Sequence, residues 1–246
     1  MRPSLIFPLA ALLFLLTLLI RLPAAWIAGL LPASLRCNAP SGTLWNGYCT
    51  SLLVQDQGQS FTWNGLRWQL HPLALLTGTV SASLQSADPA APGQAEARLH
   101  GRTVQVQDLQ LRLPPALIAP WLPPGWSGSL SLAVDHASLS GQRIQSLQGS
   151  ATAQDVRSTS PALNLGDLRL LVPAQSGDNL HGSFADLGNG PLMIDGTVTL
   201  DNADHYAVSG TVSARAGAGD DLRNLLALLG RPDAQGRYRF SLSGSL

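Results

Sequence analysis

Residues 78–84 read GTVSASL, and this short pattern decides the fold class. A glycine is followed by Ser or Thr and then by apolar residues that alternate with small polar ones. Val80, Ala82 and Leu84 therefore fall on one face of an extended chain. The pattern recurs as GSLSLAV from Gly128, GTVTL from Gly196, GTVSA from Gly210 and GSL from Gly244. Each glycine is interpreted as a turn residue at the start of a strand.

Further alternating runs lie between these repeats, and turn residues separate the runs at intervals of roughly 8 to 15 residues, as in all-β domains. The sequence therefore predicts a mainly β protein. We expect a long antiparallel meander that forms a curved sheet, a sandwich or a partly open barrel.

Three local patterns place strands near the two ends of the chain. Asn46-Gly47 is a type I′ turn signal within residues 41–54. Residues 66–70 (LRWQL) put Trp68 and two leucines on one face, which predicts that this face is buried. Residues 238–242 (YRFSL) alternate in the same way and predict a final strand with both aromatic rings on its buried face.

Helical patterns are few and short. Residues 73–78 and 114–126 each hold one or two turns before Gly78 or a proline ends them. Residues 221–230 (DLRNLLALLG) have an acidic start, four leucines on one face and Gly230 as a stop. The sequence predicts two or three short helices in addition to the N-terminal segment.

The N-terminal run of residues 5–20, LIFPLAALLFLLTLLI, contains no charge. It reaches the ~20 residues of a spanning helix only if the segment after Arg21 contributes. Arg2 is the only charge before the run, so the positive-inside rule places the N-terminus in the cytoplasm and the following residues across the membrane. A cleaved signal peptide and a buried helix of a soluble protein are the two alternatives. We predict an anchor and its flank in residues 1–32 and a β-rich domain on the other side of the membrane in residues 33–246, a single-pass topology.

The charge content indicates no nucleic-acid partner. Charged residues make up 12% of the chain, the formal net charge is zero, and every basic side chain other than histidine is an arginine. The arginines are scattered singly, so neither a stripe that follows phosphates nor a polybasic lipid patch is present.

Cys37 and Cys49 are the two cysteines of the chain. In an oxidising compartment they are candidates for a disulfide, which would stabilise the fold by about 3 kcal/mol in the chain-entropy model. The alternative is a pair of separate thiols. A metal site is not expected, because the spacing is not C-x-x-C and no histidine lies nearby in sequence.

No motif indicates catalysis. The five histidines are spread singly along the chain, and neither an H-E-x-x-H helix, a G-x-S-x-G elbow nor a glycine-rich phosphate loop occurs. We therefore nominate no catalytic, cofactor-binding or metal-binding residue and expect the protein not to be an enzyme.

Six tryptophans are conspicuous in so weakly charged a chain. Core filling is the ordinary role of such rings, and the alternation around Trp68 favours it there. Trp26, Trp45, Trp121 and Trp126 are the candidates for contact with a bilayer surface or an apolar partner.

Several longer segments carry a resemblance to a known family. These are the apolar N-terminus, SGTLWNG at residues 41–47, LRWQLHPLALLTGTV at 66–80 and LLALLGRPDAQGRYRFSLSGSL at 225–246. In order and spacing they resemble the type II secretion system protein N family, over essentially the whole chain. Cys37 and Cys49 are not part of that pattern.

The resemblance implies a non-catalytic, single-span inner-membrane subunit of the machine that exports folded proteins across the bacterial outer membrane. It also implies that the β-rich domain of residues 33–246 lies in the periplasm. Its partners would be the other subunits of that machine. The family also looks distantly similar to AsmA-like periplasmic β-rich proteins associated with lipid handling. The alternative function is therefore a module that binds a lipid or another apolar ligand on its sheet.

Overall fold

The computed structural model describes residues 14, 17–29, 31–56, 59–119, 122, 124–141, 143–159, 162–177, 179–201 and 205–245. The chain divides into two compact units. Unit 1 comprises Met1–Pro92 and Glu96–His100, and unit 2 comprises Gly93–Ala95 and Gly101–Leu246.

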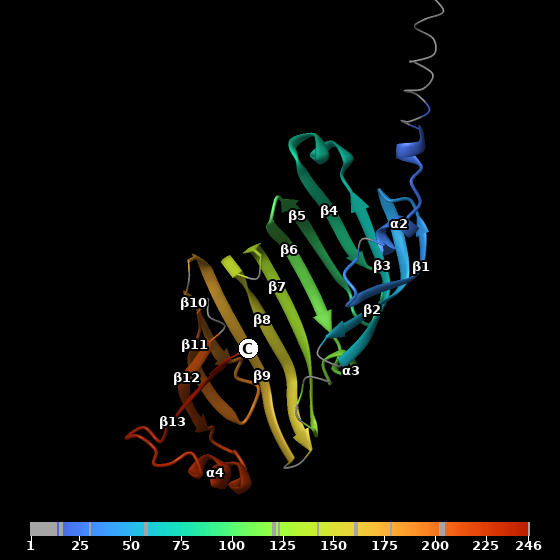
Figure 1. The fold of residues 1–246 in the computed structure, drawn as a ribbon. Coiled ribbons are helices and arrows are strands. Elements are labelled where there is room, and N and C mark those ends of the chain that lie inside the picture. Colours follow the sequence, from blue (N-terminus) through green and yellow to red (C-terminus); the bar gives the residue numbers. More distant parts are fainter. Residues whose placement is uncertain are drawn as a thin grey trace, which may run out of the picture. The chain divides into compact units, whose positions relative to one another are not determined.

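Thirteen strands make up most of the described chain (Figure 1). They are β1 (Leu35–Gly42), β2 (Asn46–Asp56), β3 (Gln59–Leu70), β4 (Thr79–Ser86), β5 (Gly93–His100), β6 (Thr103–Leu113), β7 (Trp126–Ser140), β8 (Arg143–Thr159), β9 (Ala162–Ser176), β10 (Asn179–Asp186), β11 (Leu192–Asp201), β12 (His205–Ala214) and β13 (Tyr238–Ser245).

The order of the strands in the sheet is their order in the chain, from β1 to β13. The pairings described within each unit are antiparallel, for example Leu52 opposite Trp63 in unit 1 and Val198 opposite Val208 in unit 2. The predicted antiparallel meander is confirmed. The order ends at β1 and at β13 without joining them, so the sheet is open in the part of the chain that the structure describes.

Short helical segments accompany the strands in the described part of the chain. They are α2 (Ala25–Ala28), the 3-10 helix η2 (Pro72–Thr77), α3 (Pro115–Ile118) and α4 (Asp220–Ala227). The predicted helical turns before Gly78, after Pro114 and before Gly230 are thereby confirmed. Gly78 ends η2 with φ 70°, a left-handed conformation that suits a residue without Cβ.

The predicted spanning helix falls largely on residues 5–16, which lie outside the described residues except for residue 14. Residues 17–20 are helical, and the Arg21 N–H donates to the carbonyl of Thr17 over 3.1 Å. Within the described residues, no helix has the length and apolar character needed to span a membrane.

The core of unit 1 forms around Trp68, which is 6% exposed and packs with Ala24 and Cys49. Leu66 and Leu70 pack against the same cluster, as the alternation of residues 66–70 predicts. Asn46-Gly47 is not the turn: β1 ends at Gly42, and Gly47 lies within β2 opposite Trp68. A Cβ on Gly47 would lie 2.1 Å from the Trp68 ring, so this glycine allows a close approach instead of a turn.

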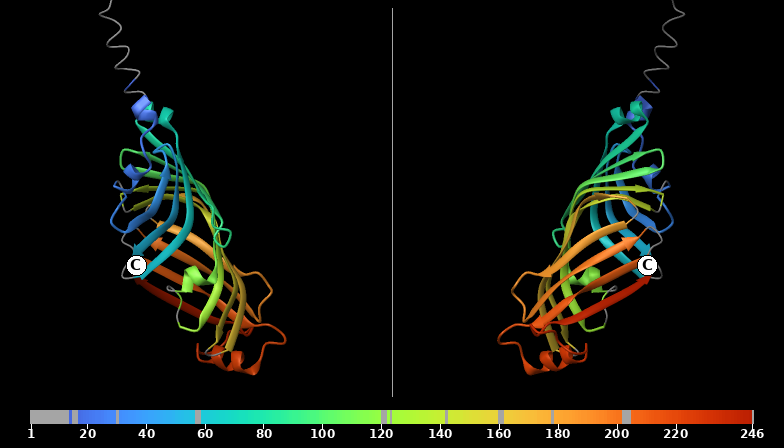
Figure 2. Two further views of the ribbon diagram at one scale, coloured as in Figure 1. Left: turned by 90° about the vertical axis from the view of Figure 1, so that its right-hand side faces the viewer. Right: turned by 90° about the vertical axis from the view of Figure 1, so that its left-hand side faces the viewer.

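The core of unit 2 lies where α4 covers the strands that precede and follow it. Leu222 and Leu226 of α4 are buried against Leu192 and Val212, and Tyr238 and Phe240 of β13 pack on the same cluster. Figures 1 and 2 both show α4 at the end of these strands. The predicted amphipathic helix and final strand are confirmed, although Leu242 on β13 remains 60% exposed.

Candidate functional site

The segment that follows the apolar run is hydrogen-bonded into the sheet of unit 1. Three hydrogen bonds hold it: Trp45 Nε1–H to the Leu19 carbonyl (2.8 Å), Leu44 N–H to the Leu22 carbonyl (2.7 Å) and Ala24 N–H to the Gly42 carbonyl (3.1 Å). Pro23 and Thr43 also form a β-bridge. Residues 19–24 and the β1–β2 turn therefore form one connected structure.

Buried apolar contacts also hold this junction, which consists of residues 19–24 and the β1–β2 turn. Ala24 is 1% exposed and packs with Trp68, whose indole N–H donates to the Leu44 carbonyl over 3.0 Å. Burying a large aromatic side chain with its N–H satisfied gives both apolar contact and orientation. The turn at residues 43–45 is consequently held by hydrogen bonds to Leu19 and Leu22 and by the hydrogen bond from Trp68.

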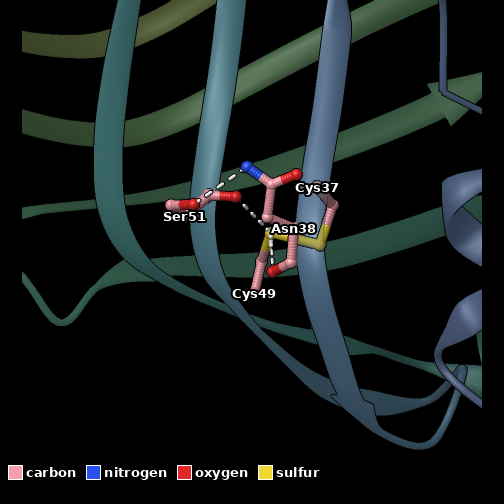
Figure 3. The surroundings of a disulfide bond; sticks show 4 residues. All are labelled: Cys37, Asn38, Cys49 and Ser51. Atoms are coloured by element: carbon pink, nitrogen blue, oxygen red, sulfur yellow. Dashed lines mark hydrogen bonds between the residues drawn. A yellow bond between two sulfur atoms is a disulfide. The ribbon is translucent and has the colours of Figure 1, made fainter.

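Cys37 and Cys49 are joined by a disulfide between β1 and β2 (Figure 3). Their Cα atoms are 5.7 Å apart, within the usual range for such a bond. Cys49 is fully buried beside Trp68, and the Asn38 side-chain amide donates to Ser51 Oγ over 3.1 Å next to the bond. The bond therefore links the first strand to the core of unit 1.

The four candidate tryptophans have different surroundings. Trp26 is 63% exposed, whereas Trp45 is half-buried and bonded to Leu19. Trp126 is half-buried and lines a cavity of unit 2. Trp121 lies outside the described residues.

This cavity of unit 2 has a volume of about 430 Å³. It lies between the α3 segment and the strands β6, β7, β8 and β9. Every side chain that lines it is apolar apart from two serines: Leu113, Ile118, Leu122, Trp126, Ser127, Ser129, Leu130, Ala153, Val156 and Leu168. Its size and lining are typical of sites for apolar small molecules. The proline-rich sequence around α3 indicated a loop but gave no sign of a cavity.

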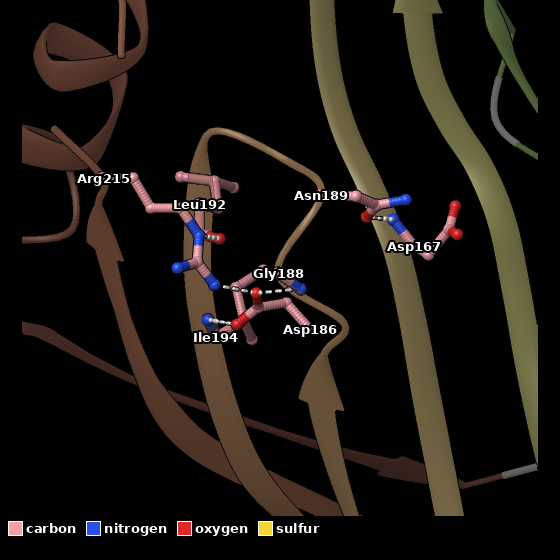
Figure 4. A network of polar contacts seen from close by, with 7 residues as sticks. All are labelled: Asp167, Asp186, Gly188, Asn189, Leu192, Ile194 and Arg215. Atoms are coloured by element: carbon pink, nitrogen blue, oxygen red, sulfur yellow. Dashed lines mark hydrogen bonds and ion pairs between the residues drawn. The ribbon is translucent and has the colours of Figure 1, made fainter. Parts of the chain in front are cut away.

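A buried carboxylate organises the β10–β11 turn of unit 2 (Figure 4). Asp186 has a side chain that is 6% exposed, and it accepts hydrogen bonds from the Ile194 N–H (2.8 Å), the Gly188 N–H (2.9 Å) and the Arg215 guanidinium. Arg215 Nε also donates to the Leu192 carbonyl over 3.0 Å. This network connects β10, β11 and the end of β12.

Burial alone would raise the pKa of the Asp186 carboxyl, because it disfavours the charged form. The hydrogen bonds from Ile194, Arg215 and Gly188, together with the charge of Arg215, outweigh that effect and hold the pKa below its usual range. A carboxylate that stays ionised and fully bonded suits a structural role better than proton transfer.

The two end strands of the sheet differ in how well an added strand could pair with them. β1 contains Pro40, which lacks an N–H, and Ala39, whose φ of 49° interrupts the extended conformation. β13 is continuous: eight successive residues pair with β12, from Tyr238 opposite Val212 to Ser245 opposite His205. Pro, bulges and charges are the usual protection of edge strands, and β13 has only Arg239.

The remaining titratable side chains of the described residues lie singly or in pairs. Among the residues that the structure describes, no group of three or more His, Cys, Asp or Glu side chains could hold a metal ion. Asp201 at the end of β11 and His205 at the start of β12 have Oδ1 and Nδ1 3.5 Å apart, and Asp195 accepts from Thr211 Oγ1 over 2.9 Å. These contacts suit strand and turn stability.

Comparison with known proteins places most of the chain in one family. The sequence profile described as "Type II secretion system (T2SS), protein N" matches residues 33–241. The chain belongs to the type II secretion system protein N family. The family resemblance given by residues 41–47, 66–80 and 225–246 is thereby confirmed.

Relatives in this family share nearly the full length of the chain. A type II secretion system protein N from Aeromonas hydrophila is 28% identical over 245 residues, 93% of each chain. One from Vibrio cholerae is 29% identical over 231 residues, 88% of this chain and 87% of the relative, and one from Klebsiella pneumoniae is 28% identical over 249 residues, 96% and 93%. No solved structure gives a significant match. As a protein N family member, the chain is a protein of type II secretion.

Proposed function

We propose that this chain is a non-catalytic inner-membrane subunit of a type II secretion machine and that its β-rich part acts in assembly of the machine. The apolar run of residues 5–20 would anchor it, with the N-terminus in the cytoplasm and residues 33–246 in the periplasm. Family membership supports the place in secretion, and the hydrogen-bonded junction at residues 19–24 supports a sheet attached firmly to its anchor.

One observation carries the assembly role: β13 is an unprotected edge strand in a sheet whose other end strand is interrupted by Ala39 and Pro40. An extended segment of another subunit can add to such an edge through main-chain hydrogen bonds, with alternate side chains giving specificity. Leu242, 60% exposed, offers an apolar contact, and Arg239 on the opposite face offers a positive charge.

Site-specific photo-cross-linking in secreting cells tests this interface. A photoreactive phenylalanine at Leu242 of the full chain should give an adduct that contains an identified subunit of the secretion machine. The matched control replaces Asp135, which is exposed on β7, a strand with neighbours on both sides. The β13 interface is wrong if Leu242 gives no such adduct or if both positions give it equally.

Deletion of the gene tests the role as a whole. Secreted substrates should remain folded and active in the periplasm of the deletion strain, and the wild-type chain should restore their export. A photo-cross-link without any secretion defect would separate binding from function. Normal export in the deletion strain would contradict a required assembly role.

A second function is favoured by the cavity of unit 2, whose apolar lining suits an acyl chain or a similar ligand. Native mass spectrometry of the full chain in mild detergent should then reveal a bound lipid. Ala153→Phe, which fills the cavity, should remove this ligand. Ala151→Phe, two residues earlier on β8 and outside the lining, should retain it. An empty wild-type protein would contradict this function.

A further inference from the structure

The loop between β3 and β4 exposes leucines to an unusual degree. In η2 (Pro72–Thr77), Leu73 is 77% exposed, Leu76 is 84% exposed and Leu75 is 45% exposed. No residue between Pro72 and Gly78 carries a charge. Clustered apolar exposure on this scale marks a contact surface, since isolated exposed leucines are common but grouped ones are not.

The backbone of the loop is held in place by its own hydrogen bonds. Ala74 N–H donates to the His71 carbonyl (3.2 Å), Gly78 N–H to the Leu75 carbonyl (3.0 Å) and Thr77 Oγ1–H to the Ala74 carbonyl (2.8 Å). His71 N–H donates to the Ser81 carbonyl over 2.9 Å, which fixes the base of the loop to β4. The leucines are therefore presented by a formed turn, and each of these hydrogen bonds lowers the cost of bringing the backbone into an apolar medium.

The register of unit 1 places this loop beside the end of the apolar run. Leu19 accepts from Trp45, and the Trp45 carbonyl in turn accepts from the N–H of Leu70, the last residue of β3 before the loop. Figure 2 shows η2 and the helical residues before Arg21 at the same end of unit 1, and Figure 1 agrees. Leu18 and Ile20 at this end are 53% and 58% exposed.

Polar residues border these apolar groups in the way that suits a bilayer interface. Arg21 follows the helical residues and is exposed, and His71 precedes η2 and is also exposed. Trp26 is exposed on α2, just after the junction. Arginine and tryptophan are both favoured where an apolar segment meets the lipid headgroups.

We propose that residues 72–78 are a second membrane contact, in which Leu73 and Leu76 insert into the headgroup and upper acyl region of the bilayer. This inference rests on the proposed anchoring of the chain by residues 5–20. Two points of attachment, the apolar run and the loop, would fix the orientation of unit 1 relative to the lipid surface. A single helix can tilt and rotate in the bilayer, and unit 1 would move with it.

Depth-dependent quenching of a fluorophore tests the contact on the full chain. Cys37 and Cys49 are bonded to each other, so Leu76→Cys introduces the single thiol for an environment-sensitive label. The labelled chain is reconstituted in vesicles of phosphatidylethanolamine and phosphatidylglycerol, with or without lipids that carry a doxyl group near the top of the acyl chain. The label should be blue-shifted and should lose most of its fluorescence in the doxyl vesicles.

Two further variants make the result decisive. Leu73→Cys should give the same loss as Leu76→Cys, which guards against a local defect at one position. Ala90→Cys is the control: Ala90 is exposed in the same unit, but it follows β4 at the end opposite to η2, where Ser86 pairs with Leu66. Its label should remain sensitive to an aqueous quencher and insensitive to the doxyl lipids.

Each other outcome overturns the inference in a distinct way. If the chain floats with the vesicles but the loop labels ignore the doxyl lipids, the loop does not touch the bilayer. If the loop labels are shielded from the aqueous quencher and also ignore the doxyl lipids, a protein surface covers them. If the chain does not float with the vesicles, the proposed anchoring is wrong as well.

Discussion

The rings of Phe184 and Phe240 meet with their centroids 6.2 Å apart, although two strands separate β10 from β13. The register explains this contact: Phe184 lies opposite Gly196, Gly196 opposite Gly210, and Gly210 opposite Phe240. The two glycines leave space on the sheet, and one ring extends over each of them from the neighbouring strand. A Cβ on Gly196 would lie 2.4 Å from Cζ of Phe184.

Gly196→Ala should therefore destabilise unit 2. The new methyl group would meet both the Phe184 ring and the carbonyl of Ser209, at 2.5 Å, so backbone or ring must move. Overpacking of this kind costs about 2 kcal/mol of unfolding free energy. Urea unfolding of the full chain in mild detergent, followed by near-ultraviolet circular dichroism, measures it.

Two companion variants show whether the ring is responsible. Thr197→Ser changes the adjacent exposed residue, which points to the other face, and keeps the hydroxyl that lies 3.3 Å from Ser209 Oγ. It should alter the unfolding free energy by less than about 0.5 kcal/mol. In a Phe184→Ala background the cost of Gly196→Ala should shrink, because the two residues are in contact. Additive costs would show that the methyl group does not meet the ring.

These glycines also show where sequence reasoning reached its limit. The alternation in GTVTL and GTVSA predicts strands, and both segments lie in strands, because alternation is a local property. The same patterns predict that their glycines start the strands, and this is wrong: Gly196 and Gly210 lie in the middle of β11 and β12. A glycine that ends a turn and one that admits a ring from another strand look alike in sequence, since the ring belongs to a residue far along the chain.

The same distinction separates what was predicted at the candidate sites from what was not. LALLTG predicts the helical turn that carries the exposed leucines. It does not predict that this turn lies beside the end of the apolar run, because that position depends on the hydrogen bonds of Trp45 with Leu19 and Leu70. Likewise, Asp186 and Arg215 are 29 residues apart, and no local pattern joins them. Sequence reveals local periodicity and turns, whereas long-range register decides which side chains meet.

The Asp186 network predicts a pH-dependent contribution to stability. Asp186→Asn should lower the unfolding free energy at neutral pH by about 2 kcal/mol, because it leaves Arg215 with a weaker partner. This loss of unfolding free energy is smaller than for a fully buried ion pair, because the Arg215 side chain is 31% exposed and solvent screens its charge. Urea unfolding at neutral pH measures the difference from wild type.

The difference between wild type and Asp186→Asn should depend on pH in a defined direction. The pKa of Asp186 is lowered in the folded protein. An Asp side chain in the unfolded chain has a pKa of about 3.9. The stabilisation is thus complete above about pH 4 and is lost as the pH falls through the folded pKa. A difference that grew on acidification would contradict the assigned role of the carboxylate.

The indole of Trp45 should control how tightly residues 19–24 hold to the sheet. Trp45→Phe keeps an aromatic ring but removes the donor to the Leu19 carbonyl, at a cost of about 1 kcal/mol. Amide exchange at Ala24 and Leu44, whose N–H groups bond across the junction, should accelerate. Trp26→Phe, at a ring that is 63% exposed, is the matched control and should leave both amides protected.

The disulfide should stabilise unit 1 appreciably. Replacing both Cys37 and Cys49 with alanine opens a closed loop with a sequence separation of 12 and should lower the unfolding free energy by about 3 kcal/mol. Thiol titration of the unfolded wild-type chain, before and after reduction, should show two thiols only after reduction. Unchanged stability in the double variant would mean that the bond contributes nothing to the fold.

Removal of residues 238–246 should be more damaging than any of these substitutions. It deletes β13 with Tyr238 and Phe240, both of which pack against the cluster around Leu222 and Leu226 on α4. Each large apolar side chain contributes on the order of 2 kcal/mol by burial, and the loss also exposes the edge of β12 to other chains. The truncated protein should therefore aggregate or be degraded, as size-exclusion chromatography and steady-state levels would reveal.

Leu242→Ser is the matched control, because this side chain is 60% exposed on the same strand and its loss should leave the fold intact. A truncated protein that remained monomeric with an unchanged melting temperature would show that β13 is not required to complete the sheet.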